Sequence, residues 1–261
     1  SRGNSMALRN IPTRIREHDW FSVIVEVLIV VAGVFVGLQV SNWNEERKET
    51  ARGNEYLRRM SDELRADADS IGHISTFWSD VQDNGRIAIA YAEDGTLAQG
   101  SAWKTLLAYY QASQVWPYRK SDVTFQEIQS SGDLQLIRNA TLRARIANHY
   151  SSGAGSQVVE VLRLLPAYRE RVRGMTPWPI QQYIWDHCYQ SAGTLQVLKD
   201  CASPVSDAEA RTVLEHYRAS TQLTEELRFW IVNVNNGLRL MSGIQSEARA
   251  IARDIDADLG R

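Results

Sequence analysis

Few residues of this chain have the types and spacing that catalysis needs. The five histidines form no HExxH zinc motif, and none neighbours a serine or cysteine in a recognisable nucleophile elbow. No glycine-rich loop ends in the Gly-Lys-Ser/Thr pattern that holds phosphates. Asp254, Asp256 and Asp258 suggest a metal cluster, but at two-residue spacing on a helix their side chains point apart. The sequence therefore predicts a non-enzymatic protein with no catalytic residue, no cofactor and no metal ligand.

The two cysteines suggest a structural rather than a catalytic role. Cys188 and Cys201 lie 13 positions apart, and the segment between them contains Gly193, which suits a closed loop. A disulfide here would remove loop entropy worth about 3 kcal/mol and would need an oxidising compartment such as the periplasm. We expect this disulfide, and two reduced thiols are the alternative. A metal site that adds His187 lacks a clear fourth ligand.

One carboxylate, Glu26, lies inside a strongly apolar run of 19 residues from Ser22 to Val40. At about 1.5 Å per residue, this run is long enough to cross a bilayer core of roughly 30 Å. Thirteen of its residues are Val, Ile, Leu or Phe, and together they favour insertion by roughly 4 to 8 kcal/mol. A charge at mid-span costs about 3 kcal/mol, so insertion remains favourable.

The polar and small residues of this run share one helical face. At 100° per residue, five of them project within about 60° of one another: Ser22, Glu26, Gly33, Gly37 and Val40. Gly33 and Gly37 form a GxxxG pattern, which lets two helix backbones approach closely in lipid. We interpret this face as a transmembrane interface, in a homo-oligomer or against another membrane subunit. Two alternatives remain: Glu26 snorkels to the headgroups, or a ring of such helices uses it to bind or conduct protons or ions.

Aromatic residues flank the run where a bilayer interface would favour them. Trp20 and Phe21 precede it and Trp43 follows it, so we expect these three to anchor the helix at the membrane interfaces. The alternative is the buried central helix of a soluble domain. The predicted division of the chain is a short tail (1–19, of which 1–5 resemble an appended or upstream extension), a transmembrane helix (20–43) and a helical extramembrane domain (44–261) with a sub-boundary near 174–180.

The rest of the chain has helical periodicity and no convincing strand. Apolar residues recur every three or four positions from Asn44 onward until Asp94-Gly95 marks a turn, with Gly53 as the weakest point. Asn233–Gly237 is an expected interruption of the last helix. Four polar residues are expected to cap helices: Ser101, Ser121, Asn139 and Ser206. The predicted fold class is all-α, with the transmembrane helix continuing into a stalk and a helical bundle.

Two segments resemble an uncharacterised bacterial family of single-span membrane proteins. Residues 38–47 read LQVSNWNEER, directly after a span with an early Glu, and residues 124–139 read TFQEIQSSGDLQLIRN. Members of that family have a short basic N-terminus, a span of this kind and a helical domain, and the flank before this span is less basic than is usual. The resemblance implies the order of parts and an inner-membrane location, and it leaves activity open.

Charge and surface residues bear on orientation and partners. The net charge of −2, with acids and bases nearly balanced, gives no electrostatic reason to expect a nucleic-acid partner. Basic residues are equally frequent on both flanks of the span, so orientation rests on the family pattern and on the cysteine pair, which favour a cytoplasmic N-terminus and a periplasmic domain. Trp178, Trp185 and Trp116 are expected to form a partner surface, with core packing as the alternative. The expected partners are the lipid bilayer and other membrane subunits or a second copy of this chain.

Overall fold

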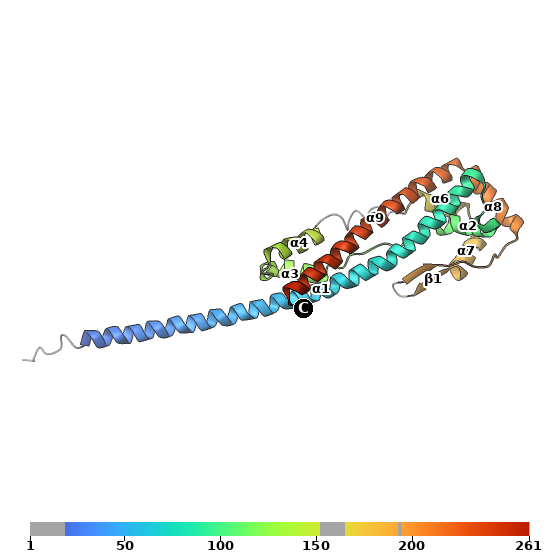
Figure 1. Cartoon of the computed structure of the whole chain (residues 1–261). Helices are drawn as coiled ribbons and strands as arrows, with labels where there is room; N and C mark the ends of the chain where they lie inside the picture. Colours follow the sequence, from blue (N-terminus) through green and yellow to red (C-terminus); the bar gives the residue numbers. More distant parts are fainter. Residues whose placement is uncertain (1–18, 152–164, 193–194, 261) are drawn as a thin grey trace, which may run out of the picture. The chain divides into compact units, whose positions relative to one another are not determined.

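The computed structural model describes residues 19–151, 165–192 and 195–260, and these are mostly helical (Figure 1). The chain divides into two compact units, the first ending at Arg52 and the second beginning at Gly53. Helix α1, Asp19–Asp94, contains the apolar run and contributes residues to both units. It ends where the sequence predicted, since Gly95 adopts a positive φ of 80° and its amide donates to the carbonyl of Tyr91.

The remaining elements all belong to the second unit. In chain order they are η1 (Ala98–Gly100), α2 (Ala102–Gln111), α3 (Val123–Ser131), η2 (Asp133–Leu136), α4 (Ala140–Ser151), α6 (Ala167–Met175), α7 (Trp178–His187), β1 (Tyr189–Ala192), β2 (Leu195–Leu198), α8 (Asp207–Ala219) and α9 (Thr221–Asp258). The turn near 174–180, between α6 and α7, belongs to this unit, and its Thr176 hydroxyl is buried against the Tyr217 hydroxyl.

Gly53 is not a weak point of α1, which is continuous through it. A Cβ atom at this position would lie 2.5 Å from the carbonyl oxygen of Leu136. The glycine therefore allows the last residue of η2 to approach α1 closely, which a helix-propensity argument could not reveal.

Helix α9 is also continuous, so the interruption predicted at Asn233–Gly237 is wrong. Val234 and Gly237 face the core, and Figure 1 shows α9 lying along α1 within the second unit. Burial of one apolar face holds the helix through its two asparagines, although asparagine is a weak helix former.

Two adjoining hydrophobic clusters form the core of the second unit. One surrounds the buried ring of Trp78, with Tyr109, Tyr217 and Trp230 among its members. The other joins Met60 and Leu64 of α1 to residues of α3, α4 and α9. The apolar positions of α1 beyond Gly53 thus pack as their helical spacing predicted.

Three of the four predicted helix caps are confirmed. Ser101 accepts a hydrogen bond from the amide of Lys104, Asn139 accepts one from Leu142, and Ser206 forms a capping box with Glu209.

The fourth predicted cap, Ser121 on α3, is wrong. The carboxylate of Glu63, from α1, accepts hydrogen bonds from the amides of Val123 (2.8 Å) and Thr124 (3.1 Å), while the Ser121 hydroxyl donates to Glu63. Burial is the largest single effect and raises the pKa of Glu63, but the hydrogen bonds together outweigh it, so the pKa is lowered. A cap from 60 residues away has no local sequence signal.

The prediction of no strand is wrong at one place. Strands β1 and β2 form an antiparallel hairpin in which Tyr189 pairs with Leu198 and Ala192 pairs with Leu195. The hairpin lies inside the loop closed by the disulfide between Cys188 and Cys201. An isolated two-stranded hairpin is marginally stable in water, so its formation here depends on that closure and on packing against α2 and α7.

Candidate functional site

The apolar run of α1 has its side chains exposed. Every residue from Trp20 to Glu49 is exposed, and the most apolar window has a mean hydropathy of 2.7 with none of it buried. By length and composition this helix could cross a bilayer. A core helix of a soluble domain would bury such side chains, so the structure gives that alternative no support.

The stripe predicted from helical phase is open within the chain. A Cβ atom at Gly33 or at Gly37 would meet nothing within 4 Å. Glu26 lies two turns earlier on the same face, and its side chain has no hydrogen bond or ion pair with another described residue. The structure thus leaves room for a close neighbour along this stripe.

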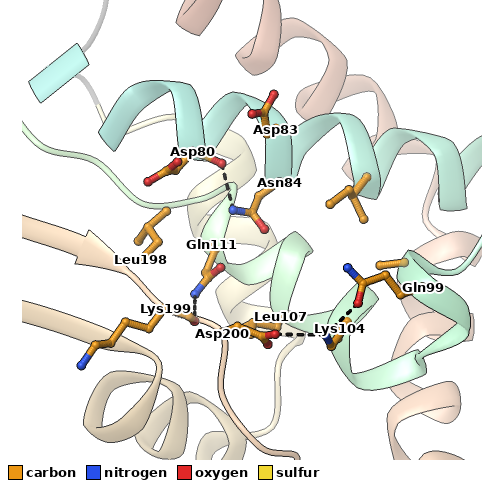
Figure 2. A pocket seen from close by; sticks show the side chains of 12 residues that line it. Asp80, Asp83, Asn84, Gln99, Lys104, Leu107, Gln111, Leu198, Lys199 and Asp200 are labelled. Carbon is orange, nitrogen blue, oxygen red and sulfur yellow. Dashed lines mark hydrogen bonds and ion pairs between the residues drawn. The ribbon is translucent and has the colours of Figure 1, made fainter. Parts of the chain in front are cut away.

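The second unit contains a cleft of about 470 Å³, shown in Figure 2. It is lined by α1, by the segment η1–α2 and by the residues at the end of β2. Its lining residues are Asp80, Asp83, Asn84, Ile87, Ala98, Gln99, Lys104, Leu107, Gln111, Leu198, Lys199 and Asp200. This volume is in the range of small-molecule sites.

The disulfide and Gln111 hold one wall of this cleft in place. The amide of Lys199 donates to the carbonyl oxygen of Cys188 (2.9 Å), across the neck of the disulfide loop. The Gln111 amide nitrogen, from α2, donates to the carbonyl oxygens of Cys188 (3.1 Å) and Lys199 (2.8 Å). The indole of Trp103 donates to the carbonyl oxygen of Cys201 (2.9 Å). Four hydrogen bonds and a covalent bond thus fix the backbone on both sides of Asp200.

Lys104 is already neutralised within the cleft. Its ammonium lies 3.0 Å from Asp200 and donates to the Gln99 side chain at 2.8 Å. Gln99 has a left-handed backbone, with φ of 49°, a conformation that costs roughly 1 to 2 kcal/mol for a residue with a side chain. The strained backbone places the Gln99 amide oxygen beside Lys104. The Lys104 ammonium therefore has both an ion pair and a hydrogen bond within the cleft.

The carboxylate of Asp80, unlike that of Asp200, has no cation beside it among the described residues. Burial, assisted by the nearby charge of Asp83, raises the pKa of Asp80. Within the described part of the chain, this carboxylate accepts no hydrogen bond and forms no ion pair. The side-chain amide of Asn84 donates instead to the main-chain carbonyl oxygen of Asp80, at 2.8 Å. The cleft therefore contains one acidic group without a cationic partner.

A cluster of polar side chains is buried near the end of α4, and its hydrogen bonds hold neighbouring elements together. The Tyr118 hydroxyl donates to Asp67 (2.8 Å), and the Lys120 ammonium donates to the carbonyl oxygens of His149 (2.9 Å) and Tyr150 (3.3 Å). Burial raises the pKa of Asp67 and lowers that of Lys120. Burial, with the Lys120 charge adding to it, lowers the pKa of His149 to about 4.

The three predicted surface tryptophans have different environments. Trp116 is partly buried: it packs edge-to-face against Phe77, and its carbonyl oxygen accepts a hydrogen bond from the indole of Trp78. Its role in a partner surface stays a prediction. Trp178 is 68% exposed. Trp185 is 38% exposed and lies under the guanidinium of Arg173.

The three aspartates near the end of α9 point apart as predicted. They contact three different partners on other elements, namely Arg145 for Asp254, Arg65 for Asp256 and Asn139 for Asp258. Within residues 19–151, 165–192 and 195–260, no group of three His, Cys, Asp or Glu side chains has the geometry to hold a metal ion.

No protein-family model, curated protein or solved structure matches this chain. The resemblance of residues 38–47 and 124–139 to a family of single-span proteins therefore stays a prediction. The cleft is a feature that sequence reasoning missed, because its residues come from three segments and no motif links them.

Proposed function

We propose that this chain is a single-span, membrane-anchored accessory subunit without enzymatic activity, which packs through its N-terminal helix in a homo-oligomer or in a larger membrane complex, such as an energy-transducing one. The proposal depends on one observation, the exposed apolar surface of residues 20–43 with its open stripe of small and polar residues. Soluble monomers rarely expose a contiguous apolar surface of this extent, and lipid would remove it from water.

The stripe favours protein–protein contact over lipid contact alone. Two glycines one turn apart allow close van der Waals packing of helix backbones, which is the main attraction between helices in lipid. A carboxyl group on the same face would gain a hydrogen-bonding partner at such an interface, whereas towards lipid it would not. Glu26, Gly33 and Gly37 would then lie at the centre of the interface.

The disulfide supports the proposed location. A bond between Cys188 and Cys201 persists in an oxidising compartment, which for a bacterial inner-membrane protein is the periplasm. We therefore propose a cytoplasmic N-terminus and a periplasmic second unit, in keeping with the family resemblance. The exposed Trp178 remains the proposed contact residue of that unit, with Trp185 beside the hairpin.

Native mass spectrometry of the full chain, purified in mild detergent, tests the proposed assembly. We expect an oligomer or a co-purifying membrane subunit, and we expect Gly33→Leu with Gly37→Leu to dissociate it because the added side chains separate the helix backbones. Val31→Phe is the matched control, since it adds bulk on the opposite face of the same helix. A strict monomer with no co-purifying subunit would contradict the proposal, as would equal dissociation by the control.

A second candidate function follows from Glu26, the one ionisable side chain in the run. In a ring of these helices its carboxyl would form a proton- or ion-binding girdle. Proton or cation flux into liposomes should then fall in Glu26→Gln, while the oligomer stays intact. Equal flux in the two proteins, or none in either, would remove this candidate and leave the packing role untouched.

A further inference from the structure

Two half-buried arginines on one face of α6 have only neutral partners in the described chain. Arg169 donates from Nη1 to the carbonyl oxygen of Ser113 (2.5 Å) and to Oε1 of Gln114 (3.5 Å). Arg173 donates from Nε to the Ser113 hydroxyl (3.2 Å) and from Nη2 to the same Oε1 atom (3.0 Å). Arginines removed from water are normally paired with an acid. The two guanidinium charges instead lie side by side without an opposite charge among the described residues.

The surroundings of these two side chains disfavour their positive charge. Burial lowers the pKa of Arg169, and the charge of Arg173 lowers it further. Burial also lowers the pKa of Arg173. The rings of Tyr110 and Trp185 lie 4.8 and 5.3 Å from the Arg173 guanidinium and offer it a weak cation–π attraction, which does not replace a counter-charge. An anion bound at this place would be attracted by both guanidiniums.

The same cluster is short of hydrogen-bond acceptors. Gln114 is 2% exposed, and its side-chain amide nitrogen is buried without a hydrogen-bond partner among the described residues. Turning this amide over would aim its N–H groups at those of Arg169 and Arg173, so the two arginines fix its orientation. A buried donor and two cations in one cluster all favour an acceptor group with negative charge.

Arg169 also has a free edge for binding such a group. A guanidinium often binds an oxyanion through two parallel N–H groups. Arg171, two residues further along α6, uses Nε and Nη2 in this way to bind the carboxylate of Glu226, at 2.7 and 2.8 Å. The same two nitrogens of Arg169 make no hydrogen bond to any described residue and are not buried, so they face solvent. Helix α6 thus has one such edge occupied by an acid of this chain and one that an external anion can reach.

We propose that Arg169 and Arg173 bind the phosphate group of a small phosphate monoester. Two phosphate oxygens accept hydrogen bonds from Nε and Nη2 of Arg169, and the Arg173 guanidinium balances the second negative charge. A carboxylate would neutralise only one of the two cations, whereas a monoester has nearly two charges at neutral pH. The Trp185 ring, 38% exposed beside Arg173, gives the organic part of the ester an apolar surface. The site lies in the second unit, so this proposal and the membrane assembly proposed above can fail separately.

Isothermal titration of the full chain in a non-ionic detergent, with phenyl phosphate as the probe, tests this site. We expect saturable binding that weakens as salt is added, since much of the attraction is between charges. Benzoate has the same ring with one charge and should bind at least tenfold more weakly. Absence of saturable phenyl phosphate binding, or equal binding of benzoate, would overturn the proposal. Dihexanoylphosphatidylglycerol has a singly charged lipid headgroup and should also bind more weakly; tighter binding would assign the site to a lipid instead of a monoester.

Two variants of Arg169 locate the binding. Arg169→Gln removes the charge and the free edge, and it should weaken phenyl phosphate binding about tenfold or more, the loss expected for a charge-assisted contact. Arg169→Lys keeps the charge without the two parallel N–H groups, so it should restore only part of the affinity. Arg86→Gln is the matched control, because it removes an equal charge from an exposed ion pair of α1. With folding verified by circular dichroism, parent affinity in either Arg169 variant, or an equal loss in Arg86→Gln, would refute this location.

Discussion

Acidification should destabilise the second unit through one buried imidazole. His149, in α4, is 8% exposed, and its burial, with Lys120 and Arg145 adding positive charge and Glu247 opposing them, lowers its pKa to about 4. The unfolded chain binds this proton at a pKa of about 6.5. Between these two values the unfolded state binds more protons, so stability is complete above about pH 6.5 and is lost as the pH falls toward 4.

The size of this loss follows from the two pKa values. Protonation of His149 should lower the free energy of unfolding by about 2 kcal/mol between about pH 7.5 and pH 5. Complete titration through both pKa values would lower it by about 3 kcal/mol. Urea unfolding of the full chain in detergent, followed by tryptophan fluorescence at both pH values, measures it. His149→Gln removes the titrating group, so the fall in free energy of unfolding on acidification should shrink by about 2 kcal/mol in this variant.

An exposed histidine supplies the control for this experiment. His73, on α1, is exposed, and His73→Gln should retain the full pH dependence of the parent chain. Carboxylates titrate in all three proteins and cancel from the comparison. The same loss of stability in parent and His149→Gln would refute the assignment of the pH dependence to this buried imidazole.

Two further predictions concern the packing and closure of the second unit. Gly53→Ala should lower its free energy of unfolding by about 1 to 2 kcal/mol, because the added Cβ meets the Leu136 carbonyl and the overlap outweighs the gain in helix propensity. Gly33→Ala is the control: its added Cβ meets nothing, so the free energy of unfolding should not change. Equal urea midpoints for the two variants would contradict this prediction. Replacing Cys188 and Cys201 by serine should lower the same free energy by about 3 kcal/mol and abolish its response to reductant, whereas a midpoint equal to that of the oxidised parent would show that the disulfide adds no stability.

Local signals in the sequence predicted much of the helical structure. The caps at Ser101, Asn139 and Ser206 were predictable because a cap involves residues only two or three positions apart. The spacing of apolar residues in α1 identified its buried face for the same reason, since helical phase is fixed within a few turns. The disulfide was predictable because the chain has two cysteines and a short segment between them.

Contacts between distant segments explain the predictions that failed. Glu63 caps α3 from α1, and Gly53 makes room for the last residue of η2, so neither role can be recognised from the neighbouring residues in the sequence. The short strands formed because closure by the disulfide compensates for a weak strand pattern.

The sequence by itself determined the apolar helix of residues 20–43 and the phase of its small and polar stripe, because both depend only on side-chain type and on the repeat of one helix. The tertiary structure alone decided the cleft. Asp80, Gln111 and Asp200 lie on three segments that meet only after the hairpin is closed and α2 is packed. Their side chains line one cleft only because packing brings these distant segments together, and no local sequence pattern indicates it.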